Sequence, residues 1–471
     1  MCRVEGFKAI VGVAAVALGV GLSNVGHADT LEAALVRAYQ NNPQLNAQRA
    51  SVRATDETVP QALSGYRPRV SITASVGTQY TDSLTKTQSA LTGGTAVYTD
   101  AHGINAPRSV GATVTQNVFN GFQTANRTRA AESQVSAARE GLRVLEQTVL
   151  LAAATIYMDY LRDAAIVEVQ RSNTRVLEQT LKQVRDRFSV GEVTRTDVAQ
   201  SEAQLAAGRS QLLAAESNLT TTRANFRRII GNEPGQLAPG TPVDRFFPGS
   251  LPSAVEMGLI QNPNVTAAMH GIDVSFLNVK VAEGALFPTV NLVASVQQSY
   301  ETTLPILRSF GASAAAQISV PVYQGGSEYS LIRQNKETLA QQRLVLDQVR
   351  DQTRATVVQS WGQLQAAKAQ VTSAAAQVTA SETALNGVRE EARVGQRTTL
   401  DVLNAQQALV NARVAMVTAQ HDRIVASYST LAAVGRLSPS ILGLSTTIYD
   451  PSVHYHQVRD AWTGVRTPDG R

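Results

Sequence analysis

The feature that most constrains this sequence is a short motif that occurs twice, each time between long helix-like segments. The first copy runs from Arg187 to Val198, and the second from Arg393 to Val402. Gly191 and Gly395 hold the same place in the two copies, 204 positions apart. Because glycine readily takes a positive φ, each copy predicts a tight turn between two helices. The chain should therefore contain the same helical hairpin tip twice.

The residues that follow each glycine predict the start of the returning helix. Thr194 lies three positions before Asp197, and Thr398 lies three positions before Asp401. Threonine is a favoured N-cap, and an acidic side chain three residues later can accept a hydrogen bond from the backbone of the cap. Both aspartates are thus expected to cap helices, whatever else they do.

The composition favours long helices packed through small and aliphatic side chains. Aromatic residues make up only 5% of the chain and charged residues 17%. A large compact core usually contains more large side chains than this. The formal charge of +5 is a weak excess, and no basic cluster with interleaved aromatics accompanies it. The sequence therefore argues against nucleic acid as a partner.

The first 28 residues have the pattern of a secretory signal peptide. Arg3 and Lys8 give a charged start, and the apolar run from Ile10 to Leu22 is too short for an ordinary membrane span. The only cysteine, Cys2, would be removed with this segment, and it is poorly placed for lipidation. The mature protein is expected to begin at residue 29, without disulfides.

Period-two alternation of apolar and polar residues predicts four strands that can each bury one face. The first strand and its partner are separated by a polar loop of about 25–30 residues, whereas the corresponding loop of the second pair is shorter. The predicted strands are 68–80, 108–119, 288–300 and 311–323.

Seven-residue spacing of apolar residues predicts the long helices, of which the longest would extend roughly 100 Å. They are 124–190, 195–231, 326–394 and 398–434. A short helix is predicted from Leu31 to Asn41. A second should run from Pro43 to about Gly65, with a kink at Pro60.

The whole order of elements repeats along the chain. Asn42-Pro43 recurs as Asn262-Pro263 at an offset of 220, before the loop difference changes the offset to 204 at the tips. We therefore predict a first repeat over 29–247, a second over 248–437, and an irregular or mobile polar tail over 438–471. The expected fold class is mainly α with a small β part, built from a duplicated unit of two strands and a long helical hairpin.

Four strands cannot close on themselves in a membrane, where about eight is the smallest known number. Open strand edges in a membrane are also strongly disfavoured. The chain is therefore expected to oligomerise.

At this point the sequence resembles the TolC family of outer-membrane efflux and secretion ducts. The resemblance covers roughly 31–437. It rests on the two tips, on the paired strand entries Tyr66-Arg67-Pro68 and Leu286-Phe287-Pro288, and on the stretch from Pro321 to Gly326. The missing lipidation cysteine favours the TolC-proper branch, which serves type I secretion.

The resemblance implies a homotrimer in the outer membrane, in contact with its lipid. Three chains would form a 12-stranded outer-membrane β-barrel continued by a 12-helix periplasmic α-barrel. It implies a passive channel, opened at its periplasmic tips by a periplasmic adaptor and an inner-membrane transporter of the RND or ABC type. It implies no enzymatic activity and no cofactor or metal.

The resemblance also implies roles for individual residues. Asp401 matches the first aspartate of an acidic pore ring, while the second falls at Asn404. Arg397 matches an arginine that ties the second tip to the first, with Thr196 and Asp197 as its partners. A clamp tyrosine of the family is replaced by Ala392. The residues expected to form the docking tips are Val190, Gly191, Glu192, Val193, Thr194, Val394, Gly395, Gln396 and Thr398.

Two other classes of protein stay open as alternatives. A periplasmic coiled-coil adaptor or scaffold would explain the helices, but not four amphipathic strands in two equivalent places. An enzyme fits less well, because the chain has no nucleophile–base constellation and no phosphate loop. His454 and His456 lie close together, but a metal site needs more ligands nearby, so a solvated tail is the preferred interpretation.

Overall fold

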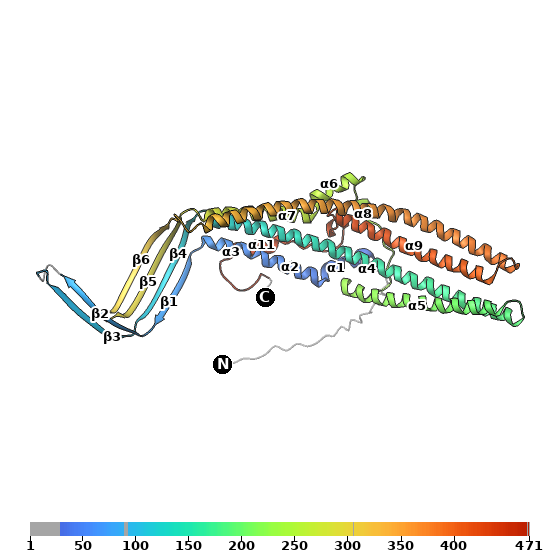
Figure 1. Ribbon diagram of the computed structural model, residues 1–471, viewed down its shortest axis with the longest axis horizontal. Coiled ribbons are helices and arrows are strands. Elements are labelled where there is room, and N and C mark those ends of the chain that lie inside the picture. Colours follow the sequence, from blue (N-terminus) through green and yellow to red (C-terminus); the bar gives the residue numbers. More distant parts are fainter. Residues whose placement is uncertain (1–28, 89–92, 305, 469, 471) are drawn as a thin grey trace, which may run out of the picture.

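The computed structural model describes residues 29–88, 93–304, 306–468 and 470. The predicted signal peptide lies outside these residues. The chain is strongly elongated, with its strands at one end and two helical hairpin tips at the other (Figure 1). The predicted fold class, mainly helical with a small β part, is confirmed.

The helices account for most of the length of the molecule. In order they are α1 (Leu31–Asn41), α2 (Pro43–Asp56), α3 (Thr58–Leu63), α4 (Gln123–Ser189), α5 (Arg195–Ile230), α6 (Leu251–Gln261), α7 (Pro263–Gly284), α8 (Ser327–Arg393), α9 (Thr399–Ala433), α10 (Pro439–Leu442) and α11 (Ser452–Val458). Both α4 and α8 contain 67 residues, about 100 Å of helix. Among the described residues, no helix combines the length and the apolar character needed to cross a membrane.

The seven-residue stripes lie where the helices pack. Val135, Leu142 and Val149 on α4 are buried, as are Val357 and Leu364 on α8. The largest core cluster surrounds the middle of α4, where α1, the end of α9 and the segment after α9 converge. These contacts join the two sequence repeats into one packed layer of helices.

Two asparagines join short helices end to end beside the long ones. Asn42 accepts hydrogen bonds from the first backbone N–H groups of α2, and its side-chain amide donates to the carbonyl of Ile229 near the end of α5, at 3.5 Å. Asn262 does the same between α9 and α7, donating to the carbonyl of Ala433 at 3.0 Å. Each asparagine satisfies unpaired groups at two helix ends at once. The short helices therefore continue one another along α4 and α8 (Figure 1).

The strands form a four-stranded antiparallel sheet in the order β1-β4-β5-β6, and a separate two-stranded hairpin. Their bounds are β1 (Arg69–Val76), β2 (Gln79–Gln88), β3 (Ala96–Asn105), β4 (Arg108–Asn120), β5 (Thr289–Thr303) and β6 (Ile306–Ser319). Ala112 lies between Ile72 and Val296, and Val296 lies opposite Ala312. The predicted apolar faces of all four strands thus form one continuous face.

The opposite face of this sheet is polar. The hydroxyl groups of Ser75 and Ser109 lie 2.8 Å apart, and those of Ser295 and Ser313 lie 2.9 Å apart. Both pairs join neighbouring strands directly across the ladder. The sheet therefore separates an apolar surface from a hydrophilic one.

The prediction of one long polar loop after the first strand was wrong. β1 ends at Val76, and β2 pairs with β3 over Gln79 to Gln88 to form a hairpin that extends beyond the sheet (Figure 1). One face of this hairpin is rich in threonine and serine, and β-branched threonine suits strands. The other face mixes exposed large side chains (Tyr80, Leu84, Tyr98 and Ile104) with charged ones such as Lys86. This mixture hid the alternation from the search for an apolar face.

Two further boundaries differ from expectation. The second helix breaks at Glu57 rather than at Pro60. Proline has no N–H for the carbonyl four residues earlier, so the defect falls at Asp56. At the other end, β6 stops at Ser319, although the alternation continues through Val320 and Val322. Within the single chain these residues lie beyond the start of β5 and have no strand to pair with.

The tail, predicted to be irregular or mobile, is helical only in α10 and α11 among its described residues, but it is packed against the rest of the chain. After α9 the chain packs back along α1, α2 and α4. His454 is buried, with its Nδ1 3.0 Å from a carboxylate oxygen of Asp56, which is itself 0% exposed. The tail ends beside the entry to β1, where Arg67 donates a hydrogen bond to the carbonyl of Ala461 at 2.6 Å. The preferred interpretation of His454 as a solvated residue is therefore wrong. The sequence did not reveal its partner, because Asp56 lies 398 positions away.

Candidate functional site

The two hairpin tips lie together at the end of the molecule opposite the sheet (Figure 1). Gly191 and Gly395 have φ values of +76° and +80°, as expected for helix-ending glycines. The next residue in each tip donates a hydrogen bond back to the last helical turn: Glu192 to Arg187 at 3.0 Å, and Gln396 to Glu391 at 2.9 Å. Both turns are therefore closed by the same backbone bonds.

Each tip presents an apolar side chain to solvent. Val190 and Val394 occupy equivalent positions and are both 71% exposed. Gly191, Glu192, Thr194, Gly395, Gln396 and Thr398 around them are also exposed, and Val193 is half-buried. The backbone of each tip is held by its own hydrogen bonds. The two tips therefore present their exposed valines on turns of the same conformation.

Asp197 and Asp401 form the predicted capping boxes. One carboxylate oxygen of Asp401 accepts hydrogen bonds from the backbone N–H of Thr398 at 3.0 Å and from its hydroxyl at 2.9 Å. The carboxylate of Asp197 has the same two partners on Thr194, at 2.9 and 2.7 Å. These hydrogen bonds lower the pKa of both carboxyl groups, so both are negatively charged near neutral pH.

Arg397 is paired within its own tip. Its Nε lies 2.8 Å from a carboxylate oxygen of Glu391, and this bond raises the pKa of the guanidinium. Among the described residues, no hydrogen bond or ion pair links Arg397 to Thr196 or Asp197. The predicted contact between the two tips is thus not made within one chain in this structure.

Polar side chains farther from the tips link the two hairpins instead. The amide of Gln204 on α5 donates to Gln407 on α9 at 3.0 Å. Gln406, one residue earlier, is buried and donates to Asn173 on α4 at 3.4 Å. Asn404, at the position of a second acidic ring, is exposed. The sequence analysis missed the glutamine pairs, because glutamine on a helix carries no signal of its partner.

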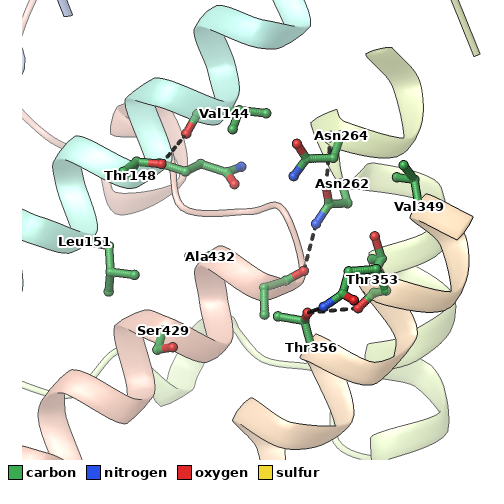
Figure 2. A pocket seen from close by; sticks show the side chains of 13 residues that line it. Val144, Thr148, Leu151, Asn262, Asn264, Val349, Thr353, Thr356, Ser429 and Ala432 are labelled. Atoms are coloured by element: carbon green, nitrogen blue, oxygen red, sulfur yellow. Dashed lines mark hydrogen bonds between the residues drawn. The ribbon is translucent and has the colours of Figure 1, made fainter. Parts of the chain in front are cut away.

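A separate cavity lies at the joint between α9 and α7 (Figure 2). It has a volume of 520 Å³ and is bordered by α4, α7, α8 and α9. Asn262 points across its edge toward the end of α9, and Thr148, Thr353 and Thr356 line its walls (Figure 2). None of the described residues that line it carries a charge. The cavity thus lacks the acid, base or ligand groups that a catalytic site requires.

The third candidate surface is the apolar face of the four-stranded sheet. Val70, Ile72 and Val76 on β1 are all largely exposed, as is Ile318 on β6. Soluble proteins rarely expose so large a continuous apolar surface, which is typical of contact with a membrane or another chain. The tips and the sheet face are thus the exposed apolar surfaces that these elements offer for binding.

Comparisons with known proteins identify the family of this chain. Residues 34–232 and 254–436 match the model of a family described as outer membrane efflux protein. The chain is 40% identical over 445 residues to the outer membrane efflux protein BepC of Brucella suis, covering 94% of this chain and 93% of BepC. It is 25% identical over 454 residues to the outer membrane protein TolC of Escherichia coli, covering 92% and 87%.

A solved structure has the same fold. The outer membrane protein VceC of Vibrio cholerae superposes with a TM-score of 0.73 at 19% identity, covering 86% of this chain and 96% of VceC.

Proposed function

Because this chain belongs to the outer membrane efflux protein family, we propose that its tips form the periplasmic entrance of a trimeric duct. The chain is an exit duct of an efflux or secretion system in the outer membrane, with a large periplasmic helical part. The family is one of efflux channels and is not an enzyme family. The observation that carries the proposal is the placement of an apolar-faced sheet and two matching exposed tips at opposite ends of long helices.

The sheet is the proposed membrane part. Its outer strands, β1 and β6, each leave one edge unpaired within the chain. Three copies joined edge to edge would satisfy these backbone groups, which a membrane cannot do. The apolar face would then contact lipid, and the serine-rich face would line a water-filled passage.

The tips are the proposed docking surfaces. Val190 and Val394 offer two equivalent apolar contacts, each beside a rigid, hydrogen-bonded turn. A coiled-coil hairpin of a periplasmic adaptor is the partner that fits helix ends of this kind. An inner-membrane RND or ABC-type transporter would supply the energy, because the proposed duct is a passive channel.

The closed entrance is proposed to depend on Asp401 and Arg397. Three Asp401 side chains around the axis would form a ring that attracts cations, and Asn404 would weaken any second ring. Arg397 would reach Thr196 and Asp197 of a neighbouring copy, exchanging its bond to Glu391 for a contact between chains. The latch is supported by the exposed position of Arg397, whose side chain is 52% exposed and is paired with the similarly accessible Glu391.

Single-channel conductance in planar bilayers tests the proposal. The wild-type protein should give a small conductance that divalent cations block, and Asp401→Ala should lose the block. Asp197→Ala is the control for the block alone. It removes the equivalent helix cap and a proposed partner of Arg397, so it should raise the conductance but keep the divalent block. If well-folded protein gives no conductance, the chain is a scaffold and not a duct. If divalent block survives in Asp401→Ala, the ring lies elsewhere.

The latch has its own test in the same assay. Arg397→Ser should raise the conductance of the closed channel, because the tips lose a contact. Arg393→Ser removes a neighbouring arginine that bonds Glu390 at 3.0 Å within its own turn, and it should leave the conductance unchanged. Equal conductance in both variants would remove Arg397 from the gate.

A further inference from the structure

The end of the C-terminal tail holds a large apolar side chain in an exposed position. Trp462 is 68% exposed, yet the guanidinium of Arg67 lies 4.7 Å from the centre of its ring. Arg67 also bonds the carbonyl of Ala461, the residue before the tryptophan, at 2.6 Å. These two contacts hold the indole ring in one place while most of its surface stays exposed. An exposed apolar ring that is held in this way suggests a binding partner.

The tail is tied to the helices on the way to this point. His454 contacts the buried Asp56 at 3.0 Å, and Arg459 lies 3.7 Å from Glu132 on α4. These contacts are spaced along the tail and fix its course before Trp462 is reached. The position of Trp462 relative to the sheet is therefore set by the fold.

That position coincides with the edge of the apolar sheet face. Arg67 precedes Val70, the first apolar-face residue of β1, by three residues, which is at most about 10 Å of extended chain. Other exposed aromatic side chains lie in the segments that join the helices to the strands of the sheet. They are Tyr66, Phe122, Phe287 and Tyr323.

Tryptophan and arginine together suit the boundary between lipid and water. The indole ring is apolar but carries an N–H, and it prefers the headgroup region of a membrane. The guanidinium can pair with a lipid phosphate while its stem stays against apolar surface. Val465 and Arg466, just beyond Trp462, are also fully or largely exposed and offer the same combination.

We propose that the C-terminal tail is a membrane anchor, in which Trp462 and Arg67 insert among the phospholipid headgroups of the periplasmic leaflet of the outer membrane. The proposal rests on the outer-membrane location of the sheet. In addition to the strands, the C-terminal tail would then contact the lipid, although it lies at the opposite end of the sequence from β1. The anchor would fix the height of the duct in the membrane independently of the lipid-facing strands.

Fluorescence of a single tryptophan tests the anchor, because the chain has only two tryptophans. Trp361→Phe leaves Trp462 alone. The full-length variant is reconstituted into phosphatidylethanolamine–phosphatidylglycerol vesicles, with or without bromine atoms on the acyl chains near the headgroups. We expect brominated lipid to cause a clear loss of Trp462 emission. Lipid brominated near the chain ends should cause a smaller loss.

Two variants serve as controls. Trp462→Phe leaves only Trp361, which packs among Ala254, Val357 and Val434 on the helical part, and brominated lipid should not change its emission. Arg67→Ala in the Trp361→Phe background should reduce the quenching, because Arg67 no longer holds the indole.

Other outcomes would overturn the proposal. Quenching of Trp462 by aqueous acrylamide and not by brominated lipid would place it in water. Resistance to both quenchers would place it against a second copy of the chain. Flotation of the protein with the vesicles separates these results from a failure of the outer-membrane assignment, because protein that does not float has not inserted.

Discussion

Single residues decide how the helices of the two repeats are held together, and His421 is the clearest case. It lies buried on α9, with Nε2 2.9 Å from Asp159 of α4 and Nδ1 2.8 Å from Asp422. Arg162 on α4 also faces this group and bonds Asp159 at 2.8 Å. Burial is the largest influence on the pKa of His421 and lowers it, but the bonds to Asp159 and Asp422 outweigh burial and raise the pKa above its usual value.

This raised pKa predicts how stability depends on pH. The charged imidazole favours the folded state, so its contribution is complete below the unfolded pKa of about 6.5 and disappears as the pH rises through the folded pKa. Chemical unfolding between pH 6 and pH 9 should show a loss of stability in wild type that His421→Gln lacks. His270→Gln, which removes a looser histidine 3.6 Å from Asp273, should keep the wild-type dependence. Parallel pH profiles for wild type and His421→Gln would contradict this assignment.

A second prediction at this scale concerns Gly121, where the first repeat approaches the end of α7 in the second repeat. Its φ is +63°, and a Cβ placed there would overlap the carbonyl oxygen of Gly284 at the end of α7. Gly325 is its equivalent, with φ +70° and no atom of the chain within 4 Å of a Cβ. Gly325→Ala should cost about 1 kcal/mol from backbone strain alone, and Gly121→Ala clearly more. Equal losses in denaturant unfolding would mean that the approach to Gly284 relaxes freely.

These residues mark what the sequence could and could not predict at the smallest scale. Gly191, Gly395 and the capping aspartates were predicted, because a turn and a cap are local and depend on neighbours within four positions. The partners of His421 and Gly121 were not, since Asp159 and Gly284 are more than 150 positions away. The gate contact predicted for Arg397 is likewise beyond the reach of local pattern, and it stays a prediction.

At the scale of elements, the tail shows how one buried hydrogen bond can place a whole segment. Asp56 is 0% exposed, with His454 at 3.0 Å and Arg139 at 3.9 Å. His454→Ala would leave the buried Asp56 with Arg139, at 3.9 Å, as its remaining partner. Loss of a hydrogen bond to a buried polar group typically costs about 1–3 kcal/mol. Denaturant unfolding should show this loss, and limited proteolysis should show earlier cleavage of the tail.

Two further variants separate the charge from the packing. His456→Ala, on the exposed side of the same short helix α11, should change neither measurement. Asp56→Asn should recover part of the stability lost in His454→Ala, because a neutral amide is cheaper to bury without a partner. If the double variant Asp56→Asn, His454→Ala is as unstable as His454→Ala alone, the contact between Asp56 and His454 is not what holds the tail.

Periodicity predicted the long helices and the strands with an apolar face, because both patterns follow from burial on one side. The hairpin of β2 and β3 and the course of the tail left no such clear pattern. One face of the hairpin mixes apolar side chains such as Tyr80 and Ile104 with charged ones, and the tail is placed by Asp56 and Arg67 from the other end of the chain. Elements held by distant polar contacts are invisible to a local pattern.

At the scale of the whole molecule, the internal repeat specifies how copies of the chain should meet. Within one chain β4 of the first repeat pairs with β5 of the second, and Val114 lies opposite Ala294. The repeat relates Val114 to Ile318 at an offset of 204, and Ala294 to Ala74 at an offset of 220. The free edge of β6 should therefore pair with β1 of the next copy, with Ile318 opposite Ala74. The same register would give Val320 and Val322 the partner strand that they lack within one chain.

Disulfide trapping measures this register directly. The chain's only cysteine, Cys2, lies in the predicted signal peptide, so introduced cysteines would be alone in the mature protein. Ile318→Cys with Ala74→Cys should link chains into covalent dimers and trimers on oxidation, since directly opposite Cβ atoms lie about 4.5–5.5 Å apart. Ile318→Cys with Ser75→Cys is the control, because Ser75 lies on the polar face and should not link. Linkage through Ser75 instead of Ala74 would mean that the strands between copies are shifted by one residue. No linkage at either site, from protein that inserts into vesicles, would mean that the edges of β1 and β6 do not meet, and the trimeric duct would need a different closure.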